Sequence, residues 1–305
     1  MTVVVTAAAG PLGRAVLERL LAHGMEPSLL VATDRPASGL GALESLGVIA
    51  VASDPEDARS LDAVLGGAQT VVYLPTDRPD HRVAEASAVV GAAARAGVAW
   101  IVLVTTLAAG TSAAADADEQ RFPEAAVTAS GGPFTIVRLG PATEDFLPVL
   151  QQADRSNELV AAWGEGRVAS APAEDYAEGI GRILTASGYE GRVVELTGDP
   201  AWSGEEFAAA ATAVLGRTIT YARRTEDERP IDLDAAGLPP ERRAATLAHE
   251  VAIRDGALAR TSHELAALLG RPTTPLADAL RAAAAREAQL TRPGGVTLQR
   301  PGQTA

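Results

Sequence analysis

Short apolar runs alternate with longer segments of helical spacing along the first half of the chain. Continuous runs of β-branched and aliphatic residues are typical of strands that are buried on both faces of a parallel sheet. Their alternation with helical segments predicts successive βαβ units. The six predicted strands are TVVVTA from Thr2, SLLVAT from Ser28, GVIAVA from Gly47, TVVYLP from Thr70, AWIVLVTT from Ala99 and FTIVRLG from Phe134.

The pattern changes in the second half of the chain. Before the sixth strand, AAGTSAAADADEQRFPEAAV is small and polar and predicts a loop that leads into a short helix. AAWGEGRVASAPAEDYAEGIGRIL predicts a turn, a short strand and a helix, and GRVVELTGD predicts one more strand. SGEEFAAAATAVLG predicts a helix with Ser203 as its N-cap and Gly216 just past its end. From about residue 231 we expect helices, and TRPGGVTLQRPGQTA has the composition of a loose tail.

Composition and charge narrow the set of partners. Hydrophobic residues make up 47% of the 305 residues and aromatic residues only 4%, which predicts an aliphatic core. The formal charge of −13 repels phosphate backbones and anionic membrane surfaces, so neither nucleic acid nor membrane is an expected partner. The first apolar run is too short for a signal peptide or a membrane span, and we predict a cytoplasmic protein.

Several chemistries are excluded by residue type. The chain has no cysteine, which rules out disulfides, thiolate metal ligands and thiol nucleophiles. Its four histidines lack the spacing of a zinc-binding helix, and we interpret each as a surface or capping residue: His23, His81, His249 and His263. No metal site is therefore predicted.

A turn of small residues joins the first strand to the first helix. Such a turn lets the backbone approach a dinucleotide pyrophosphate closely, and the helix N-terminus behind it attracts the anion. The three positions that matter are Ala7, Gly10 and Gly13. If Ala7 needs a positive φ, alanine costs roughly 1 kcal/mol or more; if its backbone is extended, alanine adds only a methyl group. The alternative is a turn of the same shape that binds no cofactor.

These elements predict an α/β protein with a Rossmann-like, doubly wound parallel sheet and a small, mostly helical C-terminal lobe. We expect residues 1–145 to form the dinucleotide-binding domain. Residues 146–305 are expected to complete the sheet and to form the smaller, substrate-binding lobe.

A family resemblance extends beyond the loop. It is carried, in this order, by VVVTAAAGPLGRAVLERLLAHG, VVGAAARAGVAWIVLVTT, ASGGPFTIVRLGPATEDF and GRVVELTGDPAWSGEEFAAAATAVLGR. The chain resembles NmrA-like members of the atypical short-chain dehydrogenases over nearly its whole length, and its layout is similar to that of type 2 NAD(P)H:quinone oxidoreductases. The family's G-x-x-G-x-x-G pattern is present with Ala7 in place of the first glycine.

The resemblance implies cofactor contacts at the ends of the predicted strands. Asp54 would face the adenine amino group, and the nicotinamide and its ribose would be bordered by Pro75, Thr76, Thr105 and Thr106. For each residue, an ordinary strand-end turn is an equal alternative. The pyrophosphate would be surrounded by Ala7, Ala8, Ala9, Gly10, Pro11, Leu12 and Gly13.

The end of the second strand bears on the choice of nucleotide. An acidic residue there binds the ribose hydroxyls of NAD(H), and a basic residue binds the 2′-phosphate of NADP(H). Asp34 lies where many members of the resembled family carry a phosphate-binding arginine, which favours NAD(H) over NADP(H). Arg35 follows directly and remains a candidate for contact with a phosphate.

The usual tyrosine–lysine pair of short-chain dehydrogenases is excluded because the chain contains no lysine. The polar candidates for catalysis are Thr106, Glu124 and Tyr73, each with a structural role as its alternative. Where relatives of quinone-reductase type carry a histidine and Thr-Glu, this chain has Gln120 and Pro123-Glu124. Quinone reduction needs little acid–base assistance, so proximity and orientation can suffice.

We therefore hypothesise an NAD(P)-dependent oxidoreductase that transfers hydride to a quinone or conjugated carbonyl, with a small aromatic or quinone-like substrate. The lysine-free, Ala- and Arg-rich composition favours a bacterial source and a role in secondary metabolism, and a homodimer is left open. One alternative is a non-catalytic, dinucleotide-sensing regulator of NmrA type. Another is a cofactor-free biosynthetic enzyme on the same fold.

Overall fold

The computed structural model describes residues 1–36, 39–76, 78, 81–107 and 115–290, except for the side chains of 115–121 and 290. The chain divides into two compact units. Unit 1 comprises Met1–Pro141, Ala173–Pro200 and Arg260–Thr273, and unit 2 comprises Ala142–Pro172, Ala201–Ala259 and the chain from Thr274 onward. The chain first leaves unit 1 for unit 2 after Pro141, close to the predicted domain boundary at residue 145. The assignment of dinucleotide binding to one domain and substrate binding to the other stays a prediction.

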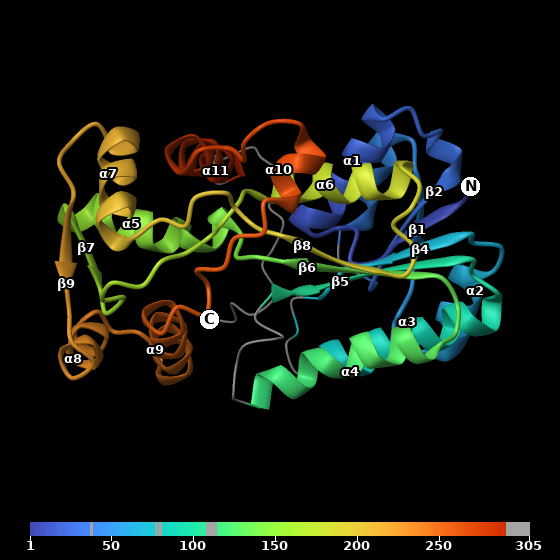
Figure 1. Cartoon of the computed structure of the whole chain (residues 1–305), viewed down its shortest axis with the longest axis horizontal. Coiled ribbons are helices and arrows are strands. Elements are labelled where there is room, and N and C mark those ends of the chain that lie inside the picture. Colours follow the sequence, from blue (N-terminus) through green and yellow to red (C-terminus); the bar gives the residue numbers. More distant parts are fainter. Residues whose placement is uncertain (37–38, 77, 79–80, 108–114, 291–305) are drawn as a thin grey trace. The chain divides into compact units, whose positions relative to one another are not determined.

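Unit 1 is built on a seven-stranded sheet with the order β3-β2-β1-β4-β5-β6-β8, in which every neighbouring pair is parallel (Figure 1). The fold class and all seven strands predicted for this sheet are confirmed. The strand order reverses between β1 and β4, which opens a crevice at the carboxyl ends of the strands. The strands are β1 (Val3–Val5), β2 (Leu30–Asp34), β3 (Ile49–Ala52), β4 (Thr70–Tyr73), β5 (Trp100–Thr106), β6 (Phe134–Leu139) and β8 (Arg192–Leu196).

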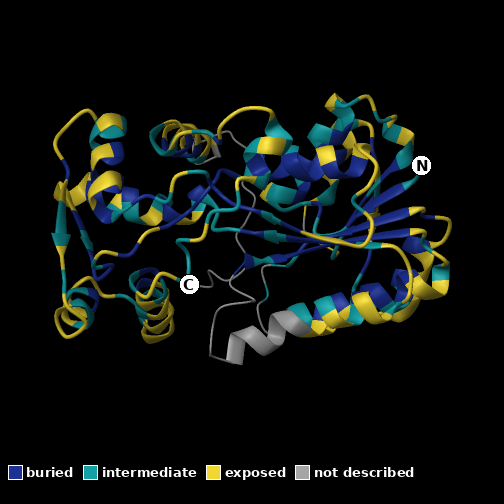
Figure 2. Cartoon of the chain, viewed as in Figure 1, coloured by how far each residue is buried: buried dark blue, intermediate teal, exposed yellow. Residues whose placement is uncertain are grey.

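Helices cover both faces of this sheet (Figure 1). One face packs against α1 (Pro11–Ala22), α6 (Ala173–Thr185) and α10 (Glu264–Leu269), and the other against α2 (Ala58–Leu65), α3 (Arg82–Ala96) and α4 (Ala115–Ala129). Two 3₁₀ helices, η1 (Pro27–Leu29) and η2 (Leu40–Leu46), flank β2. The inner strands of the sheet are largely buried in Figure 2, and aliphatic side chains dominate the core between them and the helices.

Unit 2 is mostly helical and carries a parallel pair of short strands, β7 (Glu158–Ala161) and β9 (Thr220–Arg223). Its core contains aromatic rings packed edge to face, with Phe146 4.8 Å from Trp202 and 6.0 Å from Trp163 between ring centroids. The other elements are η5 (Thr143–Phe146), α5 (Leu147–Ser156), α7 (Gly204–Leu215), α8 (Glu228–Ala235), α9 (Pro240–Arg254) and α11 (Leu276–Leu290).

The predicted ends of α7 are confirmed. Ser203 and Glu206 form a reciprocal capping box, and Gly216 ends the helix with φ +69°. None of the helices in the described part of the chain combines the length and apolar character that crossing a bilayer requires.

Three sequence predictions need correction. The short strand predicted within AAWGEGRVASAP does not form: in residues 162–172, Val168 and Ala171 make isolated bridges, and β7 ends before them at Ala161. β9 was not predicted as a strand, because its four residues are half-exposed and show no clear alternation of apolar and polar positions. The helix before β6 is not short: α4 continues for 15 residues through Pro123, whose ring removes one backbone donor without ending the helix. The predicted loop at 108–114 and the predicted tail at 291–305 lie outside the described residues.

Candidate functional site

A cavity that is partly open to solvent lies at the carboxyl ends of β1 to β4, beside the reversal of strand order. Pro55, Leu61 and Val89 supply apolar surface, which suits a flat base. The polar residues that line it come from four strand ends and one helix: Thr6, Thr33, Asp34, Arg35, Ser53, Tyr73, Thr76 and Glu85. The predicted residues Ala7, Asp34, Arg35, Tyr73 and Thr76 thus share one cavity.

The loop between β1 and α1 is held tightly against both. The Ala8 N–H donates to the Thr33 carbonyl at 3.1 Å, and the Gly10 N–H donates to the Ala7 carbonyl at 3.2 Å. α1 begins at Pro11 with Gly10 as its N-cap, so the first free N–H groups of the helix adjoin the loop. This arrangement provides donors and a positive dipole end for a phosphate.

Ala7 adopts φ +46°, so of the two conformations considered from the sequence the left-handed one is present. This conformation is sterically strained for a residue with a Cβ and is not strained for glycine. We expect Ala7→Gly to raise the free energy of unfolding by about 1 kcal/mol, as measured by chemical denaturation. Ala9→Gly is the matched control and should lower it, because Ala9 has no positive φ to relieve. Equal effects of the two substitutions would contradict this account.

The two charged residues at the end of β2 point to different partners. One oxygen of Asp34 accepts a hydrogen bond from the Ala9 N–H at 3.1 Å, and the other accepts one from the Arg35 N–H at 2.7 Å. The Asp34 carboxylate is therefore fixed against the phosphate loop. The Arg35 guanidinium lies 3.7 Å from a carboxylate oxygen of Glu85, on the far side of the cavity.

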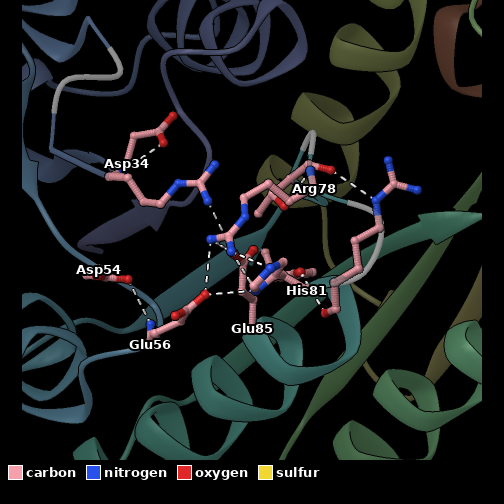
Figure 3. Close-up of polar contacts among 10 residues, drawn as sticks. Asp34, Asp54, Glu56, Arg78, His81 and Glu85 are labelled. Carbon is pink, nitrogen blue, oxygen red and sulfur yellow. Dashed lines mark hydrogen bonds and ion pairs between the residues drawn. The ribbon is translucent and has the colours of Figure 1, made fainter. Parts of the chain in front are cut away.

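A cluster of charged residues from three elements surrounds Glu85 (Figure 3). Arg78 lies 3.0 Å from Glu56, 3.6 Å from Glu85 and 2.7 Å from Nδ1 of His81. The ligand atoms of Glu56, His81 and Glu85 lie within 4.8 Å of one another, a spacing that suits a metal ion. The Arg78 guanidinium is bound among them and already supplies a positive charge.

Sequence reasoning did not find this cluster. His81 was interpreted as a surface or capping residue, and it does occupy the N-cap position of α3. Glu56, Arg78 and Glu85 were not singled out. The available signal was the run of charged residues from Arg78 to Glu85 directly after an apolar strand, where a strand-end site is expected.

Other predicted cofactor residues lie near the cavity without lining it. Asp54 stabilises the turn after β3, where its carboxylate accepts a hydrogen bond from the Glu56 N–H at 3.0 Å. Pro75 is half-buried directly after β4. Their contacts with a nucleotide stay predictions.

The three candidates for catalysis have different surroundings. The Tyr73 hydroxyl donates to the Arg82 carbonyl at 3.2 Å, and burial raises the pKa of Tyr73 well above its usual value. Arg138 binds both oxygens of Glu124 at 3.0 and 2.7 Å, and the Thr105 hydroxyl donates to the same carboxylate at 3.0 Å. Thr106 is half-buried at the end of β5. Tyr73 and Glu124 are thus held in structural contacts, and a catalytic role for any of the three stays a prediction.

Comparison with known proteins agrees with this geometry. The family model described as NAD(P)H-binding matches residues 7–167. Quinone oxidoreductase 2 of Escherichia coli is 31% identical over 278 residues, which cover 91% of this chain and 97% of that protein. NAD(P)H azoreductase of Xenophilus azovorans is 31% identical over 242 residues, covering 78% and 82%.

Solved structures show the same fold. The E. coli NADPH-dependent quinone oxidoreductase complexed with NADPH superposes with a TM-score of 0.85, covering 92% of this chain and 98% of that one. Triphenylmethane reductase of Citrobacter sp. superposes with a TM-score of 0.86 at 26% identity, covering 93% and 99%. The likeness therefore extends over both units of the chain.

Proposed function

This chain belongs to the NAD(P)H-binding, NmrA-like family, and on that premise we propose that it is an NAD(P)H-dependent oxidoreductase that reduces quinones or similarly conjugated small molecules. The observation that carries the proposal is the strand-end cavity beside a loop whose backbone donors and helix N-terminus suit a dinucleotide. The relatives act on quinones, azo compounds and triphenylmethane dyes, which share a conjugated and electron-poor acceptor.

We further propose NAD(H) as the preferred cofactor. The two solved relatives are described with NADPH or NADP(H), so this preference would be a departure that the chain's own residues support. Asp34 places a carboxylate at the end of β2, beside the phosphate loop, where a 2′-phosphate would meet a like charge. The ribose hydroxyls of NAD(H) would instead find an acceptor there.

The bound cofactor would supply the hydride, and the protein's part is to position it. The loop from Ala7 to Gly13 would hold the pyrophosphate, and Thr105 and Thr106 would lie at the nicotinamide end of the sheet edge. The quinone oxygen can take its proton from water, which fits the absence of a tyrosine–lysine pair. No step in this scheme needs a metal ion.

The test is a titration of the purified protein with NADH and NADPH, followed by calorimetry, and then addition of quinone, azo and triphenylmethane acceptors. We expect binding and acceptor-dependent oxidation of the nucleotide, with NADH bound more tightly. Binding without turnover on any acceptor would favour the dinucleotide-sensing regulator. No binding at millimolar nucleotide would favour a cofactor-free enzyme.

A further inference from the structure

We infer that Glu85 sets the nucleotide preference, because its buried carboxylate occupies the two guanidinium groups that a 2′-phosphate would need. This inference rests on the proposed binding of a nicotinamide dinucleotide in the strand-end cavity. It assigns the preference to a residue of α3, distant in sequence from the charged pair at the end of β2.

Glu85 is an unusual residue for the wall of a cavity. Its side chain is fully buried, and neither oxygen accepts a well-formed hydrogen bond from a described residue. The nearest positive charges are Nη1 of Arg35 at 3.7 Å and Nη1 of Arg78 at 3.6 Å. A buried carboxylate without such neighbours would be strongly unfavourable, so Glu85 depends on both arginines.

The arginines depend on Glu85 in turn. Arg35 directly follows Asp34, at the strand end where dinucleotide folds recognise the 2′ position of the adenosine ribose. Its guanidinium is turned across the cavity toward Glu85. Arg78 is held on its other sides by Glu56 and His81, so it is already directed inward (Figure 3). Both cations thus converge on the same acidic group.

Two nucleotides would meet this arrangement differently. A 2′-phosphate binds guanidinium groups through charge-assisted hydrogen bonds, and to obtain them it must compete with Glu85. If the 2′-phosphate bound the two guanidinium groups, the Glu85 carboxylate would stay buried without its positively charged partners. NADH carries hydroxyls at this position and can bind while the contacts of Glu85 with Arg35 and Arg78 stay intact.

The ionisation of Glu85 is consistent with this dependence. Burial raises the pKa of Glu85, and the Thr76 side chain and the charges of Arg35, Arg78 and His81 oppose that rise. Removing the carboxylate by substitution therefore removes the buried acidic group on which the two arginines converge.

The decisive variant is Glu85→Gln, which keeps the shape and removes the charge. Calorimetric titration should show NADPH binding at least about tenfold tighter than in the wild type, with NADH changed by less than about threefold. In an Arg35→Met, Arg78→Met background the same substitution should produce no gain for NADPH. Glu56→Gln is the matched control: Glu56 also contacts Arg78 but is half-exposed and does not line the cavity, so the ratio of affinities should stay unchanged.

Different outcomes of these titrations would contradict the role of Glu85 and the proposed function. If Glu85→Gln weakens NADPH binding, or changes both nucleotides equally, Glu85 supports the arginines rather than competing for them and the inference is wrong. Should the glutamine variant not fold, Glu85→Met fills the same volume without charge and must shift the ratio in the same direction. Wild-type protein that binds neither nucleotide would overturn the proposed function itself.

Discussion

Replacing Gly13 with alanine is expected to abolish nucleotide binding and to lower the free energy of unfolding by about 3 kcal/mol. A Cβ at this position would lie 2.5 Å from the Ala7 carbonyl oxygen and 2.7 Å from Cα of Ala8. Both are backbone atoms, so α1 would have to move away from the loop. Helix propensity alone predicts the opposite sign, because alanine in a helix is favoured over glycine by about 1 kcal/mol.

A matched control for Gly13 lies in another helix. Gly91 is inside α3, and a Cβ there would have its nearest contact at 3.5 Å, with the flexible side chain of Arg95. Gly91→Ala should therefore stabilise the protein by up to about 1 kcal/mol and leave the affinity for NADH unchanged. Chemical denaturation and NADH titration of both variants test the account. A Gly13→Ala protein that binds NADH like the wild type would refute the close approach of loop and helix.

Arg229→Met is expected to destabilise unit 2 by about 3–5 kcal/mol at pH 8. Glu250 is 4% exposed and accepts hydrogen bonds from the Ala162 N–H at 2.8 Å and from Nε of Arg229 at 2.9 Å. Without Arg229 the Glu250 charge would be buried with one backbone donor and, among the residues that the structure describes, no paired cation. A buried charge that has lost its partner is far more costly than an intact pair is stabilising.

The loss should depend on pH in a defined direction. Burial raises the pKa of Glu250 above its ordinary value of 4.5, and Ala162 and Arg229 oppose the rise. The folded state therefore holds a proton more tightly than the unfolded state, and removal of Arg229 extends this difference. The destabilisation should be complete above the raised pKa and should disappear as the pH falls toward 4.5.

Denaturation curves from pH 8 down to pH 5 measure this dependence. Adding Glu250→Gln to Arg229→Met should recover much of the stability at pH 8, because the neutral amide oxygen can still accept from Ala162. The second substitution should also make the free energy of unfolding of the Arg229→Met protein independent of the Glu250 titration. A loss of stability that is the same at every pH would show that packing of the Arg229 side chain, not the charge of Glu250, is responsible.

The architecture of unit 1 was predictable because its signals are local and repeated. The inner strands of the sheet are apolar runs that are largely buried, as for Val3 to Val5, whereas the edge strands β3 and β8 are partly exposed. Each run is followed by a helical segment. β7 and β9 lack that signal. Each has four residues, and their pairing joins segments about 60 residues apart, a long-range contact that no local pattern reveals.

The site was predictable as a location but not as a set of contacts. The small-residue loop and the Asp34–Arg35 pair indicated the strand ends at which the structure has a cavity, because ligands of parallel sheets bind where the strands terminate. The partners of Arg35 could not be derived, since Glu85 comes from a helix that follows two strands later. Likewise, the contacts of Glu124 with Arg138 depend on the packing of α4 against the sheet, in a segment whose sequence predicted a loop and a short helix.

The interleaving of the two units along the sequence determines how the protein can be divided or made. A fragment that ends near residue 145 would lack β8, an edge strand of the sheet, as well as α6 and α10. It would also lack the reciprocal hydrogen bonds between Asp199 and Thr273, which join the last two segments of unit 1. During synthesis on the ribosome the sheet can therefore be completed only after β8 has emerged, and unit 1 only after residue 273.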